Sequence, residues 1–287
     1  MSSNRVVVLG NSGFIGKALV AHLVSSGIQV QGYSSKELDL LSPECVPALR
    51  GLVESTDTLV IISALTPDRG RDVGTMVKNI RMVENLCAFL AENPLHHVVY
   101  VSSDAVFADD VHLARETSCC DPSTFHGLMH LVRERALQAT LKQMRTPFWI
   151  ARPCSVYGSG DTHNGYGPNR FARTAKSEAR IKLFGNGEER RDHIHVEDVA
   201  RLLGLGIAEC AEGVMNLATG KALSFMDVAQ AVAEVSGKPV AIDCSPRQSP
   251  VTHRHFDITE LVKRFPSFRF TSFKQGIADM MKGTHGI

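Results

Sequence analysis

The sequence predicts an α/β fold built on a doubly wound parallel sheet, and three observations carry that prediction. Short apolar runs alternate with helix-period segments along most of the chain, as expected of a parallel sheet with helices on both faces. The first apolar run leads through a glycine-rich turn into an amphipathic helix. The 287 residues are 44% hydrophobic and 21% charged, which is ordinary for a globular protein.

Six apolar runs predict the strands of this sheet. They are Val6–Leu9, Gln29–Tyr33, Thr58–Ala64, His97–Ser102, Phe148–Val156 and Val214–Leu217. The spacing of apolar residues between them predicts helices near Phe14–Ser26, Asp72–Glu92, Thr124–Lys142 and Val196–Ala208. Ligands of such sheets bind beyond the carboxyl ends of the strands, so we expect the site in the loops that follow these runs.

After Tyr157 the regular alternation gives way to a different pattern. Residues 158–167 are rich in Gly, Asp, His and Asn, and they predict a loop. Beyond it we expect helices near Arg170–Ala179, Ser224–Ser236, Thr259–Phe265 and Phe273–Lys282, with short strands at Ile181–Phe184 and Val240–Cys244. We therefore expect one domain in residues 1–157, to which 192–217 return, and a smaller C-terminal lobe in 158–191 and 218–287.

The glycine turn after the first strand predicts a nucleotide-binding site. Gly10 allows a sharp turn out of the strand, Gly13 leaves no side chain before a pyrophosphate, and Gly16 allows close packing of helix on sheet. The following helix then offers free N–H groups and partial positive charge to phosphates. The alternative is a tight turn without a ligand.

The composition argues against several classes of partner. A net charge of +1 provides no global field for nucleic acid or an anionic membrane, and no apolar stretch is long enough to span a bilayer. Residues 1–5 lead directly into the first strand without a signal-like apolar segment. The seven cysteines include no Cys-x-x-Cys pair, so we expect reduced thiols, a cytoplasmic location and no metal or redox site.

Several phrases of the chain resemble those of one enzyme family. They are Gly-x-x-Gly-x-x-Gly at 10–16, Tyr-Val-Ser-Ser-Asp-Ala-Val-Phe at 100–107, Arg-Pro-x-x-Val-Tyr-Gly at 152–158 and a Gly-x-Gly…Arg-Asp phrase at 185–199. Together they resemble the extended short-chain dehydrogenase/reductases, which are NAD(P)-dependent sugar-nucleotide epimerases, dehydratases and ketoreductases. The resemblance implies a Rossmann-type domain, a nucleoside-diphosphate sugar as substrate, and a homodimer formed by the helices at 72–92 and 124–142.

The end of the second strand bears on the choice of cofactor. NAD enzymes usually carry an acid there that binds the ribose hydroxyls, whereas this chain has Ser34, Ser35 and Lys36. Two hydroxyls and an ammonium suit a 2′-phosphate, which favours NADP. NAD is the alternative, with these residues as a solvated turn. The resemblance assigns further cofactor contacts to Ser12, Phe14, Ile15, Asp39, Leu40, Ser63, Ala64, Leu65, Asn79 and Pro153.

The resemblance places catalytic residues after the fourth strand. Ser103 matches the hydroxyl that bonds the reacting sugar oxygen, and Asp104 matches an acid of the sugar dehydratases. Those enzymes follow the aspartate with a glutamate, but this chain has Ala105. The loss of that second carboxylate counts against a dehydratase.

The family's Tyr-Gly-x-Ser-Lys phrase is altered here to His126-Gly-Leu-Met-His130. A spacing of four residues puts both imidazoles on one face of a helix. Because imidazole has a pKa of about 6.5 without help from a neighbouring cation, we predict that His126 is a general acid or base. We expect a neutral His130 to bind the nicotinamide ribose.

Two other interpretations of the histidine pair stay open. Histidines four residues apart also form metal pairs, although no third ligand is obvious. The site can also have lost its chemistry, in which case the chain binds cofactor and nucleotide sugar as a sensor or subunit without turnover.

A basic segment in the smaller lobe suits a diphosphate. Residues 170–191 contain seven Lys or Arg and three Glu, an excess of four positive charges. Arg191 is the first candidate ligand and Asn169 the second, followed by Arg170 and Lys182, while Asp192 and Asp198 are expected to hold a loop and cap a helix. These features predict hydride exchange at a sugar carbon by an epimerase or a ketoreductase.

Overall fold

A six-stranded parallel sheet forms the centre of the structure, in the order β10-β6-β4-β3-β1-β2. The computed structural model describes residues 5–247 and 249–283; residues 1–4, which belong to the segment without a signal-like pattern, lie outside this range. The predicted doubly wound parallel sheet is confirmed. Its strands are β1 (Val6–Leu9), β2 (Val30–Tyr33), β3 (Thr58–Ile61), β4 (His97–Val101), β6 (Phe148–Pro153) and β10 (Gly213–Leu217).

The strand order places β1 between β2 and β3, so the chain winds outward from β1 in both directions. A crevice forms at such a switch point, outside the carboxyl ends of the strands. The chain after β3 lies directly beside the end of β1, because the backbone N–H of Ser63 donates to the carbonyl of Leu9 over 2.9 Å. The glycine turn and the segment around Ser63 therefore share one edge of the sheet.

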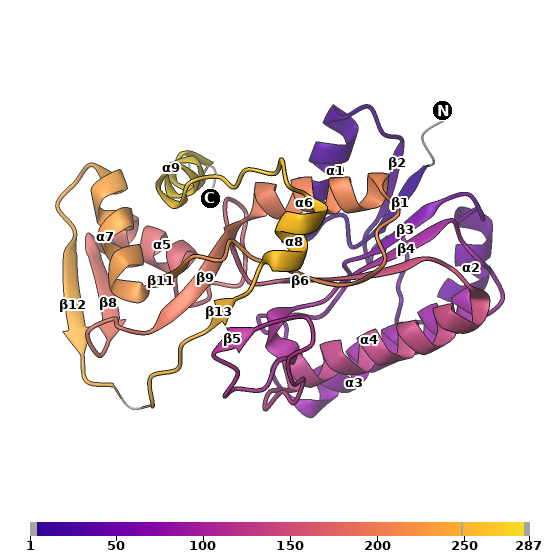
Figure 1. The fold of residues 1–287 in the computed structure, drawn as a ribbon, viewed down its shortest axis with the longest axis horizontal. Helices are drawn as coiled ribbons and strands as arrows, with labels where there is room; N and C mark the ends of the chain where they lie inside the picture. The colour runs from indigo at the N-terminus through magenta and orange to yellow at the C-terminus, as the bar shows by residue number, and fades with distance from the viewer. Residues whose placement is uncertain (1–4, 248, 284–287) are drawn as a thin grey trace.

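Helices cover both faces of the sheet (Figure 1). The alternation of β1 explains this, because Val6 and Val8 pack in one hydrophobic core and Val7 and Leu9 in another. None of the helices described is long and apolar enough to cross a membrane. One face carries α1 (Phe14–Ser25) and α6 (Val196–Ala208), and the other carries α2 (Cys45–Leu52), α3 (Val73–Leu90) and α4 (Phe125–Met144).

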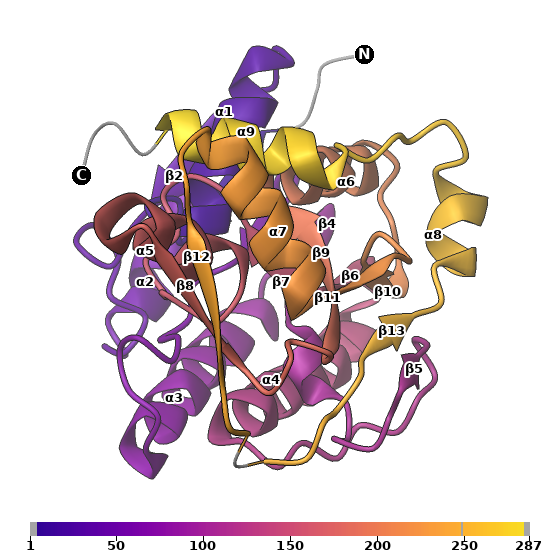
Figure 2. The same ribbon diagram turned by 90° about the vertical axis from the view of Figure 1, so that its left-hand side faces the viewer.

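A third hydrophobic core lies at one end of the molecule (Figures 1 and 2). It is built from Tyr157, Phe171, Ile181, Phe225 and Ile277 with their neighbours. A two-stranded sheet of β8 (Arg180–Phe184) and β12 (Ala241–Ser245) borders it. The helices around it are α5 (Pro168–Glu178), α7 (Phe225–Ser236) and α9 (Phe273–Gly283).

Two small sheets connect this core to the rest of the structure. In the first, β9 (Arg190–His195) pairs with both β7 (Ser155–Tyr157) and β11 (Ala222–Ser224). In the second, β13 (His255–Phe256) pairs with β5 (Leu113–Ala114). The chain then continues through α8 (Thr259–Arg264) to α9.

The elements differ from the sequence-based expectation at a few places. The expected strand at 148–156 is divided after Pro153, where β6 leaves the large sheet and β7 pairs with β9 instead. Proline has no N–H to donate to a ladder, which suits the last position of a paired strand. The predicted elements include neither α2 nor β9. The predicted helix at 224–236 is present as α7, where Ser224 and Asp227 form a capping box.

His193 of β9 is a buried histidine without a hydrogen-bond partner for its Nε2. The rings of Phe225 and Phe273 lie with their centroids 6.0 and 6.1 Å from its own. Burial, with a smaller effect of Arg191, lowers the pKa of His193 to about 3. The imidazole is therefore neutral at pH 7 and stays so well into the acidic range.

Replacing His193 with Phe should stabilise the protein at low pH. An unfolded histidine binds a proton below about pH 6.5, while folded His193 does so only near pH 3, so stability falls as the pH drops through this window. At about pH 5 this ring alone destabilises the fold by about 2 kcal/mol relative to neutral pH. Urea unfolding of parent and His193→Phe at both pH values should show a smaller loss in the variant; equal losses would contradict the argument.

Candidate active site

The glycine turn between β1 and α1 is sterically required at two of its three glycines. Gly10 has a φ of +97°, and a Cβ there would lie 2.7 Å from the backbone nitrogen of Ser63. A Cβ on Gly16 would lie 2.1 Å from the carbonyl oxygen of Gly10. At both positions the neighbouring backbone lies too close to leave room for a side chain.

The third glycine faces open space instead. A Cβ on Gly13 would meet only the Gly10 carbonyl oxygen, at an ordinary 3.4 Å. Gly13 is the N-cap of α1 and, having no side chain, leaves the first N–H groups of this helix without a side-chain cap. Nearby, Asn11 Oδ1 and Ser63 Oγ are shielded from solvent and have no hydrogen-bond partner among the described residues. Free N–H groups and an open approach fit the phosphates of a dinucleotide.

The end of β2 carries a carboxylate that the sequence analysis overlooked. Glu37 accepts hydrogen bonds from the backbone nitrogen of Ser34, over 2.8 Å, and from its hydroxyl. These bonds lower the pKa of Glu37, while the side chains of Ser35 and Lys36 are exposed. The position expected to attract a phosphate therefore lies against a negative charge.

The segment after β3 is held in place by two side chains from the helices. The Asn79 side chain accepts from the backbone nitrogen of Leu65 and donates to its carbonyl, both over 2.9 Å. Arg133 of α4 is fully buried and donates to the carbonyl of Ser63 over 2.7 Å and to Asn79 Oδ1 over 3.3 Å. Asn79 thus supports the segment Ser63–Leu65 with its polar atoms already bonded to protein.

Ser103 and Asp104 lie at the start of a short 3-10 helix, η1 (Asp104–Val106), directly after β4. Ser103 Oγ accepts from the backbone nitrogen of Ala105 over 3.1 Å and lies 3.4 Å from Asp104 Oδ1. Burial raises the pKa of Asp104, and the nearby Arg254 and Arg191 oppose that shift. A Cβ on Gly127 would lie 2.1 Å from the carbonyl oxygen of Ala105, so this glycine lets the first turn of α4, which carries His126, pack against η1.

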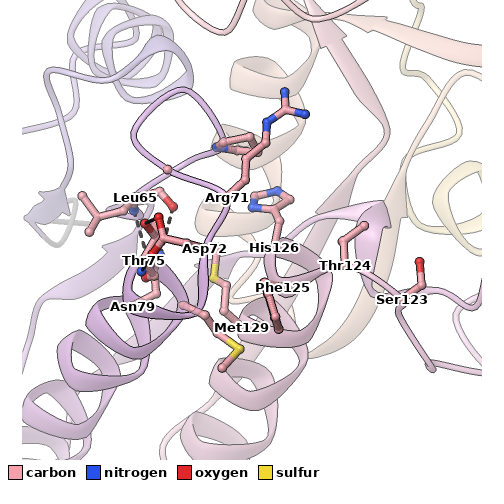
Figure 3. Close-up of a pocket in the computed structure, with 13 residues that line it drawn as sticks. Leu65, Arg71, Asp72, Thr75, Asn79, Ser123, Thr124, Phe125, His126 and Met129 are labelled. Carbon is pink, nitrogen blue, oxygen red and sulfur yellow. Dashed lines mark hydrogen bonds between the residues drawn. The ribbon is translucent and has the colours of Figure 1, made fainter.

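A pocket of about 410 Å³ opens at the N-terminal ends of α3 and α4 (Figure 3). His126 lines it, in the first turn of α4 after the cap formed by Thr124, together with Leu65, Arg71 and Met129. Burial lowers the pKa of His126 to about 4, with smaller effects of His163 and Arg71. The ring is therefore neutral near pH 7 and able to accept a proton.

His163 belongs to a contact between two loops. Its Nδ1 lies 3.0 Å from Asp161 Oδ1, and its Nε2 lies 3.6 Å from Asp68 Oδ1 in the segment before α3. The hydrogen bond to Asp161 raises the pKa of His163. This ion pair joins the expected substrate loop at 158–167 to the wall of the pocket.

His130 turns toward the sheet. Its Nδ1 lies 2.7 Å from the hydroxyl of Tyr100 on β4, and the ring is 5% exposed. The His126 and His130 rings meet edge to face with centroids 4.7 Å apart. Within the described part of the chain, no group of three or more His, Cys, Asp or Glu residues is arranged to hold a metal ion.

A buried ion pair fixes α4 against the sheet. Arg152 of β6 donates to both carboxylate oxygens of Glu134, over 2.9 and 2.7 Å, and Ser102 donates to Glu134 Oε1 over 2.6 Å. Arg152 and Glu134 are at most 3% exposed. This network holds the helix that carries both histidines.

At the far side of the cleft, Arg191 is engaged by its own chain. Its guanidinium pairs with Glu189, which also pairs with Arg247, and it donates to Thr252 Oγ1 over 2.9 Å. Arg254 lies near Arg191 and Asp104. The sequence analysis missed Arg247 and Arg254, which lie on a distant segment without a recognisable motif.

The other predicted residues divide by exposure. Asn169 is buried and accepts from the backbone nitrogen of Gly158 over 3.2 Å. Asp192 holds the loop at Thr219 and Gly220 as predicted, but Asp198 binds Thr271 rather than capping α6. Ser12, Asp39, Arg170 and Lys182 are exposed, Leu40 and Pro153 are buried, and Phe14, Ile15 and Ala64 are intermediate.

Comparisons with known proteins agree with this geometry. Residues 6–218 match the model of the NAD dependent epimerase/dehydratase family. A dTDP-4-dehydro-6-deoxy-D-allose reductase of Streptomyces bikiniensis is 25% identical over 91% of this chain and 90% of its own. A dTDP-L-rhamnose 4-epimerase of Burkholderia thailandensis is 27% identical over 55% and 46%. The crystal structure of a Thermus thermophilus UDP-glucose 4-epimerase with NAD superposes with a TM-score of 0.85 at 22% identity, covering 98% of this chain and 99% of that one.

Two glycine variants should separate folding from ligand binding. Gly16→Ala forces a methyl into the Gly10 carbonyl, so it should destabilise the fold by roughly 1–3 kcal/mol. Gly13→Ala meets no such contact, so it should keep the parent melting temperature but bind NAD or NADP at least tenfold more weakly, since the methyl faces the phosphate approach. Thermal melts and fluorescence titrations measure both. Undiminished binding by Gly13→Ala would argue against this turn as the phosphate site.

Proposed function

This chain belongs to the NAD dependent epimerase/dehydratase family, and on that premise we propose that it exchanges hydride between a nicotinamide cofactor and a carbon of a nucleoside-diphosphate sugar. The single observation that supports this most is the neutral imidazole of His126 in a pocket that Leu65 and Asn79, from the expected cofactor side, also line. The Streptomyces reductase and the Burkholderia epimerase are both named for dTDP sugars. The cofactor supplies the hydride acceptor and donor.

The cofactor would lie along the edge formed by the glycine turn and the segment after β3. The N–H groups at the start of α1 would bind its phosphates. Asn79 and Arg133 would act indirectly, because their side chains hold the backbone of Ser63–Leu65 in place. This edge is the switch point at which such sheets bind nucleotides.

His126 and Ser103 would handle the proton of the reacting sugar hydroxyl. A neutral His126 accepts that proton, and because its pKa is held at about 4, the resulting imidazolium returns it readily. An epimerase needs both transfers within one turnover. A ketoreductase needs a proton already in place, and at pH 7 only about one such imidazole in a thousand carries it. We therefore favour an epimerase over a ketoreductase.

The second candidate is a cofactor-binding protein without turnover. The orientation of His130 favours this candidate. One nitrogen of its ring is already hydrogen-bonded to Tyr100, so only the other nitrogen is left for a ligand. A weak base at His126 also contributes less to proton transfer than one with a pKa near the working pH. Turnover of the unmutated protein decides between the two candidates.

We assign the substrate to the smaller lobe, residues 158–191 and 218–287. Arg191 and Arg254 lie near Asp104 at the cleft, where two guanidinium groups suit a diphosphate. Glu189 pairs with Arg191 and Arg247. An incoming diphosphate would therefore displace the Glu189 carboxylate from Arg191. Arg170 and Lys182 are exposed and would contribute charge rather than a fixed contact.

The position of Glu37 favours NAD, although the sequence predicts NADP from Ser34, Ser35 and Lys36. Its carboxylate already accepts both hydrogen bonds that Ser34 offers. A 2′-phosphate would meet a like charge there, whereas ribose hydroxyls can donate to a carboxylate.

We further propose a cytoplasmic homodimer. The seven cysteines are all free thiols in the structure, which suits a reducing compartment. Exposed apolar side chains gather on the first turns of two long helices, with Val73 and Val77 on α3 and Phe125 and Leu128 on α4. A paired copy would cover them.

His126→Ala should abolish most of the turnover. Loss of a general acid or base lowers kcat by roughly 100-fold or more, while cofactor binding should change little. Sugar interconversion is followed by NMR on a panel of UDP-, GDP- and dTDP-sugars. His112→Ala, at an exposed site, is the control. Unchanged kcat in His126→Ala would remove the proton role, and no turnover by the parent on any sugar would support the binding protein.

Glu37→Gln should shift cofactor preference toward NADP. The amide removes the negative charge but keeps an oxygen for Ser34, so the ratio of NADP affinity to NAD affinity should rise by roughly tenfold. Glu44→Gln, at another exposed glutamate, is the matched control. Titration of both cofactors against the three proteins gives the ratios, and an unchanged ratio in Glu37→Gln would refute this role.

A further inference from the structure

One hydrogen bond next to the candidate site joins two residues that no sequence motif connects. The hydroxyl of Tyr100, on β4, lies 2.7 Å from Nδ1 of His130, on α4. Tyr100 is 1% exposed and His130 is 5% exposed. The two residues are thirty positions apart in the chain, and each lies in an element that the hydrophobic cores hold rigid.

The direction of this hydrogen bond follows from the number of partners. The Tyr100 hydroxyl has one proton, and His130 is its only hydrogen-bond partner among the described residues. A buried donor left unpaired is costly, so the phenol donates and Nδ1 accepts. Burial also raises the pKa of Tyr100, so the phenol keeps its proton.

Burial, assisted by the charge next to this pair, keeps His130 neutral. The guanidinium of Arg133 lies over the Tyr100 ring, 5.2 Å from its centroid. Burial is the largest influence on His130, and His126 and Arg133 add to it; together they lower the pKa of His130 well below its usual value. A neutral imidazole that accepts at Nδ1 must carry its proton on Nε2.

The other edge of the His130 ring makes no hydrogen bond to protein. Within the described residues, the contact with Tyr100 is the one hydrogen bond of this side chain, and it involves Nδ1 rather than Nε2. The ring of His126, which lines the pocket, is its edge-to-face neighbour. The free N–H is therefore on the side of the ring away from Tyr100.

We propose that Tyr100 is a positioning residue: its hydroxyl holds His130 in the Nε2–H tautomer and thereby presents a neutral N–H donor at the helix position where relatives carry a lysine ammonium. The acceptor would be a hydroxyl oxygen of the bound cofactor's ribose. This step rests on the proposed function, because it assigns a partner within the same site. The donor carries no charge, so it leaves His126 free of an additional adjacent cation.

The first test uses the unmutated protein without ligand. The ¹⁵N chemical shifts of the His130 ring, assigned by comparison with His130→Gln, report directly which nitrogen carries the proton. Near pH 7.5 we expect a protonated Nε2 and an unprotonated Nδ1. A proton on Nδ1, or on both nitrogens, would overturn the proposal without affecting the proposed activity.

The second test removes the Tyr100 hydroxyl alone. In Tyr100→Phe the His130 signals should move toward a mixture of tautomers, and cofactor should bind roughly threefold to tenfold more weakly, as for the loss of one positioned hydrogen bond. Tyr157→Phe removes a buried hydroxyl that lies 3.5 Å from the Phe273 carbonyl in another core; it should leave the His130 signals unchanged.

The outcomes separate the two proposals. Unaltered His130 signals in Tyr100→Phe would refute the role of Tyr100. Altered signals with undiminished cofactor binding would refute the assignment of Nε2–H to the cofactor. Absence of cofactor binding by the parent protein would refute the proposed function, while the tautomer measurement would still decide whether Tyr100 positions His130.

Discussion

The buried ion pair between Arg152 and Glu134 is the constraint on which the site depends. It joins the middle of α4 to β6, and Ser102 extends it to the end of β4. Two buried charges stabilise little by themselves, but removal of either leaves the other unpaired at a cost of roughly 3–5 kcal/mol. The pair therefore acts mainly to fix one register of helix on sheet. His126, His130 and Arg133 take their places from that register.

The two imidazoles lie at positions where the sequence resemblance implies a phenol and an ammonium, and the surrounding structure explains how such a pair is kept uncharged. Burial lowers the pKa of both rings. A fixed positive charge is nevertheless present nearby, because Arg133 is fully buried and bonded only to neutral oxygens of Ser63 and Asn79 among the described residues. This cation lies about one helical turn beyond His130 on α4, further along the helix from the ring that would exchange the proton.

The fold was predictable because local patterns determine it. The apolar runs that became β1, β3, β4 and β10, and the helical spacing of α1 and α6, appear in the sequence within one or a few residues of their bounds. The glycine turn could be predicted from the sequence as well. Three features of the site were not. Glu37 reaches back three residues to Ser34, Tyr100 contacts His130 across two elements, and Arg254 comes from a segment far along the chain. Such side-chain directions depend on tertiary packing, which periodicity does not reveal.

The chain leaves the large sheet, returns to it and then leaves it again, and this order affects how the protein folds during synthesis. The core around Phe171 and Ile181 is completed by α7, β12 and α9, and the segment that supplies them first returns to the large sheet through α6 and β10. After β8 leaves the ribosome, about forty residues follow before α7 begins and about a hundred before α9 ends, so α5 and β8 must wait for these elements before they can bury their apolar sides. During that interval those surfaces, in the lobe that we assign to the sugar, are open to chaperones and to aggregation.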